Sequence, residues 1–107
     1  ATLMSESMVG VVPSSSRWNW VEQCCYVVGE MLACGCPVIA SDCGAIPEFW
    51  GKCESVKIIP QNDIYALRST IQEVMEHPLD REVARRFIVE NYSNEVLARK
   101  YVEALQP

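Results

Sequence analysis

The sequence predicts an α/β fold in which a short parallel β-sheet is flanked by helices. Three short apolar runs, Met8–Val12, Pro37–Ser41 and Val56–Ile59, are each followed by proline or polar residues, as buried strands are. The segments between and after these runs carry apolar residues at helical spacing. Because strands that alternate with helices form β-α-β units, we expect the three strands to pair in parallel. Sheets of this kind usually have about five or six strands, so the sequence predicts part of a larger fold.

The segment after the first strand is polar and aromatic, contains Trp18 and Trp20, and is predicted to be a long loop. Residues 24–34 then form a predicted helix, and Gly35 is expected to end it in the left-handed conformation that glycine adopts without penalty. After the second strand, residues 46–50 are predicted to form a short helix with a proline in its first turn.

The rest of the chain is predicted to be three helices. Their N-caps are expected to be Asn62 or Asp63, then Asp80, and finally Ser93, because these side chains accept hydrogen bonds from the first free backbone N–H groups. The first of the three helices has apolar residues at helical spacing, which predicts one inward face made of Ile64, Leu67, Ile71, Val74 and Met75.

Composition and charge exclude several classes of protein. Half of the 107 residues are apolar and 21% are charged, which is typical of a globular domain. The net charge of −5 argues against nucleic-acid binding, which needs a basic face. The longest apolar stretch, residues 24–40, contains Glu30, Gly35 and Pro37, so we expect no membrane span. No signal peptide is visible at the N-terminus, so we expect a cytoplasmic protein and leave peripheral attachment to a membrane open.

The six cysteines have C-C and C-x-C spacings with no histidine nearby, which argues against a zinc site. A disulfide framework fits poorly with the absence of a secretory signal. A redox motif would need C-x-x-C spacing at the start of a helix, which the sequence lacks. We therefore expect most of the six to be buried, reduced thiols without a bound metal: Cys24, Cys25, Cys34, Cys36, Cys43 and Cys53.

Ligands of open parallel sheets bind beyond the carboxyl ends of the strands. The segments Pro13–Glu22, Ser41–Gly44 and Pro60–Asp63 are predicted to meet there. The first leads into a helix, whose N-terminal backbone N–H groups suit a diphosphate. Glu22 and Glu30 lie about 12 Å apart along that helix, a spacing that would let them accept hydrogen bonds from two sugars flanking a diphosphate.

The spacing of these two glutamates is not specific by itself, because two other pairs share it: Glu82 with Glu90, and Glu95 with Glu103. Glu30 differs from those residues in lying within an otherwise apolar helix. An unpartnered carboxylate there would be costly to bury, so we expect Glu30 to have a functional partner.

The run from Glu22 to Pro47 resembles the signature of the family 4 retaining glycosyltransferases. The matches are Glu22, Glu30 eight residues later, Ala33-Cys34-Gly35, Pro37-Val38 and the turn Gly44–Glu48. The resemblance implies that residues 1–107 are part of the Rossmann-like C-terminal, donor-binding domain of a GT-B fold. The N-terminus looks like the end of an element, which predicts an excised fragment, although removal of an initiator methionine would look the same.

The same resemblance implies a nucleotide-sugar donor and retaining hexosyl transfer with no metal or other cofactor. It gives Glu22 the catalytic position, in contact with donor-sugar hydroxyls near the reacting carbon, and makes Glu30 the ligand of the nucleotide ribose. Gln23, Cys24, Cys25 and Tyr26 would present backbone N–H groups to the sugar and phosphates. The cysteines depart from the small, glycine-type residue usual in this loop, and Tyr26 departs from a basic or small one.

In that family the basic residues that grip the diphosphate lie earlier in the domain, and the acceptor site lies in a partner Rossmann-like domain. We therefore expect the isolated chain to be inactive, and to pair with a missing N-terminal domain or to self-associate through exposed apolar surface. A non-catalytic nucleotide-sugar-binding or scaffold module of the same fold is the alternative, because fold does not fix function. Trp18 and Trp20 are expected to be either a stacking platform for a base or sugar, or anchors in the core.

Overall fold

The computed structural model describes residues 7–13 and 26–105 of the chain. Its sheet contains three strands, β1 (Gly10–Val12), β2 (Val38–Ser41) and β3 (Val56–Ile59), in the order β1-β2-β3. Both pairings are parallel, with Gly10 opposite Val38 and Val38 opposite Val56. The predicted α/β class and the parallel pairing of the three apolar runs are therefore confirmed.

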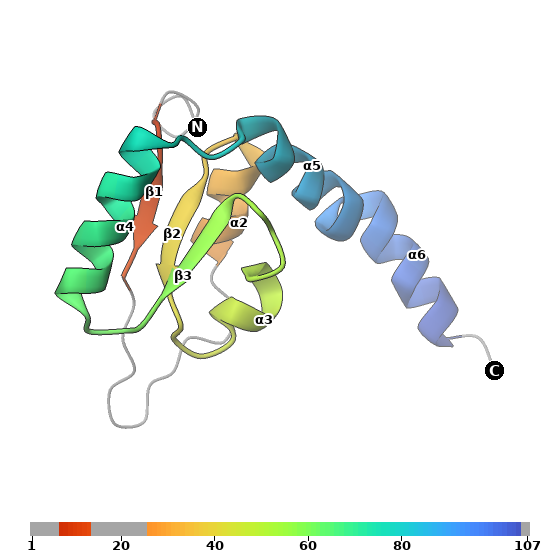
Figure 1. Ribbon diagram of the computed structural model, residues 1–107. Coiled ribbons are helices and arrows are strands. Elements are labelled where there is room, and N and C mark those ends of the chain that lie inside the picture. The colour runs from red at the N-terminus through yellow and green to blue at the C-terminus, as the bar shows by residue number, and fades with distance from the viewer. Residues whose placement is uncertain (1–6, 14–25, 106–107) are drawn as a thin grey trace.

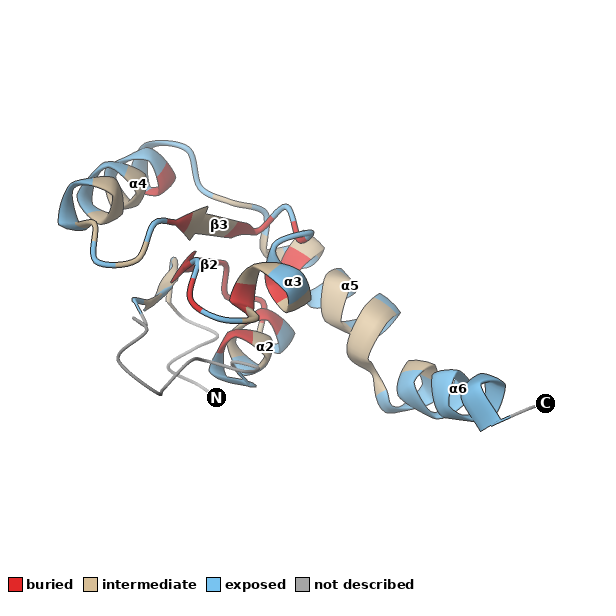
Figure 2. Ribbon diagram, turned by 90° about the horizontal axis from the view of Figure 1, so that it is seen from below, coloured by how far each residue is buried: buried red, intermediate tan, exposed pale blue. Residues whose placement is uncertain are grey.

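Five helices among the described residues complete three layers (Figure 1): α2 (Tyr26–Ala33), α3 (Ile46–Trp50), α4 (Ile64–Glu76), α5 (Arg81–Tyr92) and α6 (Asn94–Leu105). Helix α4 covers one face of the sheet, and α2 and α3 lie on the other (Figure 2). Alternate residues of β2 face the two layers, as strand geometry requires. Val38 and Ala40 pack in the cluster that includes α2, α3 and α5, and Ile39 packs with Val74 of α4.

Central strand β2 is buried along its whole length, which explains why its sequence is apolar without alternation. Leu32 and Val28 of α2 and Ile46 of α3 close the core on one side of the sheet, and none of these three side chains is accessible to solvent. On the other side the core is smaller and rests on Val74. Because β2 is packed on both faces, it fixes the position of the sheet edge at which the strands end.

The predicted helix ends are confirmed wherever the structure describes them. Asp63 rather than Asn62 caps α4, because its Oδ1 accepts a hydrogen bond from the N–H of Ala66 at 2.9 Å. The carboxylate of Asp80 accepts from two N–H groups in the first turn of α5. The hydroxyl of Ser93 accepts from the third residue of α6 at 3.3 Å. Each cap satisfies backbone donors that have no partner inside the helix.

Gly35 has φ +75°, the left-handed conformation expected for it at the end of α2. We expect Gly35→Ala to lower the free energy of unfolding by about 1–2 kcal/mol, because a Cβ costs that much in this conformation. The added Cβ would also come within 2.7 Å of Nη2 of Arg85, which would have to move. Urea unfolding measures the change. Asn62→Gly is the control: Asn62 has a similar φ of 62°, glycine tolerates it, and a loss as large as that of Gly35→Ala would contradict the conformational explanation.

The predicted inward face of α4 is wrong at two positions. Val74 is buried and Leu67 and Ile71 are partly buried, but Ile64 and Met75 are exposed. Met75 lies 100° around the helix from Val74, outside the narrow stripe that meets β2 and β3. Ile64 occupies the first turn, where α4 begins beyond the end of β3. A sheet of three strands covers only a narrow stripe of this helix.

Helix α6 extends away from the sheet and buries none of its residues (Figures 1 and 2). Its departure contributes to the elongated outline of 50 × 36 × 22 Å. Large apolar side chains are nevertheless exposed on it: Leu97, Tyr101, Val102 and Leu105. Within the part of the chain that the structure describes, no helix combines the length and hydropathy needed to cross a membrane.

Candidate functional site

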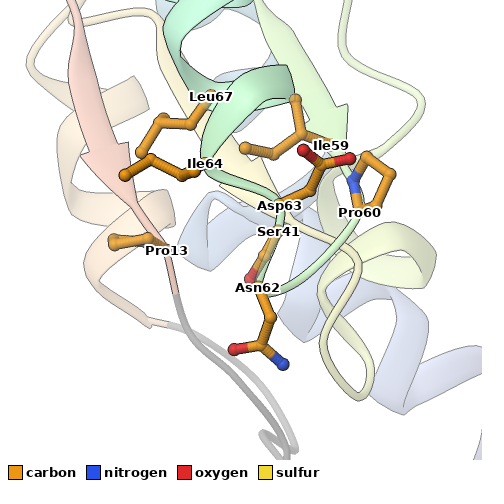
Figure 3. Close-up of a pocket in the computed structure, with 8 residues that line it drawn as sticks. All are labelled: Pro13, Ser41, Ile59, Pro60, Asn62, Asp63, Ile64 and Leu67. Atoms are coloured by element: carbon orange, nitrogen blue, oxygen red, sulfur yellow. The ribbon is translucent and has the colours of Figure 1, made fainter.

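The carboxyl ends of all three strands meet at a pocket of about 320 Å³, which we call the edge pocket (Figure 3). Pro13 follows β1, Ser41 ends β2, and Ile59 ends β3, so each strand contributes one wall. The remaining lining residues come from the turn after β3 and the start of α4: Pro60, Asn62, Asp63, Ile64 and Leu67. The segments predicted to meet at this edge do so in their described parts.

Two hydrogen bonds join the loop after β2 to the end of β3 at this edge of the sheet. The Asp42 carboxylate accepts from the N–H of Gln61 at 2.9 Å, and the N–H of Asp42 donates to the carbonyl of Ile59 at 2.8 Å. Asn62 then turns the chain in the left-handed conformation, and Asp63 starts α4. Asp42 is therefore a structural tie between the exits of β2 and β3, a role that the sequence pattern does not reveal.

The first four residues of the predicted donor site, Glu22, Gln23, Cys24 and Cys25, lie outside the described residues. Tyr26 is the first described residue of α2, and it is 73% exposed. Glu30 lies in the same helix one turn later and is also exposed. The structure thus puts the two described members of the predicted site on one outward face of α2.

The expectation that Glu30 needs a partner because it is buried in an apolar helix is wrong. The apolar residues of α2 are concentrated on the side of Val28 and Leu32, which face the core, whereas Glu30 lies on the opposite side. An exposed carboxylate keeps its hydration and needs no protein partner. Exposure also leaves Glu30 accessible to a ligand from solution.

Glu30 lines a second and larger hollow of about 650 Å³, which we call the aromatic groove. Four helices form it: α2 with Tyr26, Gly29, Glu30 and Ala33; α3 with Phe49 and Trp50; α5 with Ile88 and Tyr92; and α6 with Leu97 and Tyr101. Glu30 is the one charged residue among these lining residues. The structure does not bring Glu30 to the edge pocket, whose lining residues belong to other elements.

Several of the aromatic rings that line the aromatic groove pack against one another. The ring centroids of Trp50 and Tyr92 are 5.0 Å apart. The ring centroids of Phe49 and Phe87 lie 6.4 Å and 6.0 Å from that of Tyr92. The Tyr92 hydroxyl donates a hydrogen bond to the carbonyl of Phe49 at 3.0 Å, which ties the end of α5 to α3. Among the described residues, the buried Nε1 of Trp50 has no hydrogen-bond acceptor.

Three of the four described cysteines, Cys36, Cys43 and Cys53, are buried, and Cys34 is partly buried. Burial raises the pKa of the thiols of Cys36 and Cys53 above the usual value, which keeps both protonated and poorly reactive. The four carry no disulfide, and the described residues hold no group of three or more potential metal ligands. Cys24 and Cys25 lie outside the described residues, so the state of the full set stays a prediction.

The architecture, with three parallel strands between helical layers and a pocket beyond the strand ends, is that of a glycosyltransferase domain of the GT-B type. A family model described as "Glycosyl transferases group 1" matches residues 1–77. The chain belongs to this family.

Among solved structures, the chain is similar to sucrose-phosphate synthase from Thermosynechococcus elongatus, with a TM-score of 0.79 and 27% sequence identity. The match covers 95% of this chain but 25% of that protein, so the chain spans about a quarter of the length of its structural relative. No curated protein matches the sequence.

Proposed function

We propose that the chain is the donor-binding part of a retaining glycosyltransferase and binds a nucleoside diphosphate sugar for hexosyl transfer to an acceptor. Membership of the group 1 glycosyltransferase family over residues 1–77 carries this assignment, because that range includes Glu22, Glu30 and the segment between them. The exposure of Glu30 and Tyr26 on one face of α2 supports it, since a ligand can reach both from solution.

In this function, Glu22 is the catalytic residue that contacts the donor-sugar hydroxyls near the reacting carbon. Glu30 accepts hydrogen bonds from the ribose hydroxyls of the nucleotide. The backbone N–H groups of residues 23–26 bind the sugar and the diphosphate between the two glutamates. Two carboxylates about 12 Å apart along a helix can hold both ends of such a donor.

Retaining transfer develops positive charge on the sugar carbon and negative charge on the departing diphosphate. The helix predicted to begin near Cys24 would stabilise the diphosphate through its free N–H groups and the positive end of its dipole. Glu22 and Glu30 would fix the donor so that the diphosphate lies over that helix end. Neutralisation by backbone groups and basic side chains earlier in the domain needs no metal or other cofactor.

The acceptor site is assigned to an N-terminal Rossmann-like domain, in agreement with the chain spanning only 25% of the sucrose-phosphate synthase. The isolated chain would then bind the nucleotide sugar without turnover, in the cytoplasm or at a membrane surface. A complete protein that binds the donor but transfers no sugar would instead be the non-catalytic module of the same fold.

Substitution of Glu30 tests the proposed nucleotide contact in the complete enzyme that the assignment implies. Glu30→Ala should weaken binding of a nucleoside diphosphate by about 1–3 kcal/mol, the value of hydrogen bonds to a charged group. This corresponds to a roughly 5- to 150-fold higher dissociation constant. Isothermal titration calorimetry with UDP, GDP and ADP measures the change and identifies the base.

Glu90→Ala is the matched control, because Glu90 is also an exposed helical carboxylate and has the same spacing from Glu82 as Glu30 has from Glu22. Nucleotide affinity should stay at the wild-type value in this variant. Equal affinities in the wild type and in Glu30→Ala would make Glu30 an ordinary surface carboxylate and would remove the nucleotide contact from the assignment.

A further inference from the structure

Tyr26 and Glu30 lie on the same outward face of α2, one helical turn apart. They are separated by about 6 Å along the helix axis, so one small ligand can touch both side chains. Tyr26 is 73% exposed, and among the described residues no other aromatic ring packs against its ring. Helix α2 thus presents an accessible aromatic ring next to an accessible carboxylate.

Both side chains line the aromatic groove, whose volume of about 650 Å³ is typical of a small-molecule site. Such sites have mostly apolar walls and a few polar groups that orient the ligand. Glu30 is the charged residue among the lining residues of this groove, and the others are apolar or aromatic. A carboxylate accepts hydrogen bonds from hydroxyl groups and repels phosphate groups. The groove therefore suits a neutral, planar group that carries hydroxyls.

A nucleoside diphosphate divides into two parts that match this arrangement. Its phosphates are anionic and suit the backbone N–H groups at the start of the helix, whereas its nucleoside is neutral and combines ribose hydroxyls with a planar base. The inference made here rests on the proposed function, in which Glu30 binds the ribose. Because the base is bonded directly to the ribose, a ribose held at Glu30 brings the base within reach of the neighbouring Tyr26 ring.

We propose that the base of the donor nucleotide stacks on the ring of Tyr26 at the mouth of the aromatic groove, while Glu30 holds the ribose. Aromatic side chains stack on any of the bases, because each base has a planar π face. In the family pattern a basic or small residue stands at the position of Tyr26. The stacked ring is therefore a donor contact that this chain adds to that pattern, and it makes Tyr26 a specificity-determining residue.

Tyr26 is better fixed for this role than Tyr101, the other exposed tyrosine of the groove. Helix α2 is anchored by Val28 and Leu32, which are fully buried, whereas α6 buries none of its residues. A binding group on a packed element keeps its position and loses less conformational freedom when the ligand arrives.

The edge pocket is a poorer site for the nucleoside. Its lining residues include no aromatic ring, and Glu30 is not among them. Its carboxylate, that of Asp63, already accepts a hydrogen bond from the N–H of Ala66 as the cap of α4. The groove is thus the one of these two hollows that combines a carboxylate available to hydroxyls with a ring available for stacking.

Isothermal titration calorimetry on the complete enzyme that the proposed function implies tests the stacking. The probe is whichever of UDP, GDP and ADP the wild type binds most tightly. Tyr26→Ala should raise its dissociation constant by roughly 5- to 150-fold, the range expected for loss of one stack between a base and an aromatic ring. Tyr26→Phe should bind as tightly as the wild type, because the ring is kept.

Tyr65→Ala is the matched control and should keep the wild-type affinity. Tyr65 is also an exposed tyrosine in the first turn of a helix, at 79% exposure, but it lines neither the edge pocket nor the aromatic groove. Inorganic pyrophosphate, which has no base, should bind equally to the wild type and to Tyr26→Ala. This comparison separates the ring of Tyr26 from its backbone N–H group.

The outcomes distinguish this inference from the proposed function on which it rests. Wild-type nucleotide affinity in Tyr26→Ala, together with a loss in Glu30→Ala, would overturn the stacking and leave the nucleotide contact of Glu30 in place. An equal loss of nucleotide and pyrophosphate affinity in Tyr26→Ala would also overturn the stacking, because the substitution would then act on the phosphate contacts. A wild type that binds no nucleoside diphosphate would contradict the proposed function, and the stacking with it.

Discussion

Replacing Leu32 by alanine should lower the free energy of unfolding of this domain by about 3 kcal/mol. Leu32 is fully buried between the sheet and α5, and deletion of a buried leucine side chain leaves a cavity that typically costs about 2–5 kcal/mol. Domains of this size are stable by about 5–15 kcal/mol in total. The loss is therefore a large fraction of the stability, and it should lower the melting temperature by roughly 10 °C or more.

Urea unfolding followed by circular dichroism measures this change, at one protein concentration because association would add to the apparent stability. Leu105→Ala is the control: Leu105 is exposed at the end of α6, and its truncation should change the stability by less than about 0.5 kcal/mol. If both variants unfolded at the same urea concentration, α2 could not be packed against the sheet as described.

The sequence alone predicts the layers of this fold because its strongest signals are local. Apolar runs such as Val56–Ile59 are too short for a typical helix and are followed by proline, which favours short buried strands. The caps at Asp63, Asp80 and Ser93 and the left-handed Gly35 are equally local, because each depends on a few neighbouring residues.

The aromatic groove could not be predicted because its residues come from four separate helices. Phe49, Tyr92 and Tyr101 are far apart in the sequence and share no motif, and only the packing of α3, α5 and α6 around α2 brings them together. The exposure of Glu30 was missed for a related reason. The apolar residues around Glu30 in the sequence favour burial of its side chain, whereas the core covers the face of Val28 and Leu32.

The edge pocket can be predicted from the sequence only in part. Topology alone predicts that Pro13, Ser41 and Pro60 meet, because parallel strands end at one edge. The hydrogen bonds of Asp42 to the exit of β3 depend on the spacing of two loops, which sequence does not specify. The meeting of the strand ends is therefore predicted from the sequence, while the hydrogen bonds that hold their loops together are found from the structure.

In the complete enzyme that the proposed function implies, Glu22→Gln should lower the turnover number by a factor on the order of 100. Glutamine keeps the size of the side chain but replaces the carboxylate, so the donor sugar would lose the charge-assisted hydrogen bonds that the proposed function assigns to Glu22. The proposed function places the nucleotide mainly elsewhere, at Glu30 and the helix end, so its affinity should change little. Steady-state transfer kinetics and calorimetry with the nucleoside diphosphate measure the two effects separately.

The distinction between Glu22 and Glu30 depends on which parameter each substitution changes. A group that acts mainly in the transition state lowers turnover when it is removed, whereas a group that binds equally before and during the reaction weakens binding. Glu90→Gln is the control, because Glu90 is an exposed carboxylate on α5, and this substitution should change neither the turnover number nor the nucleotide affinity. If Glu22→Gln weakened nucleotide binding as strongly as Glu30→Ala and left turnover unchanged, the two carboxylates would have a shared binding role. Catalysis would then have to come from the helix N-terminus and the partner domain.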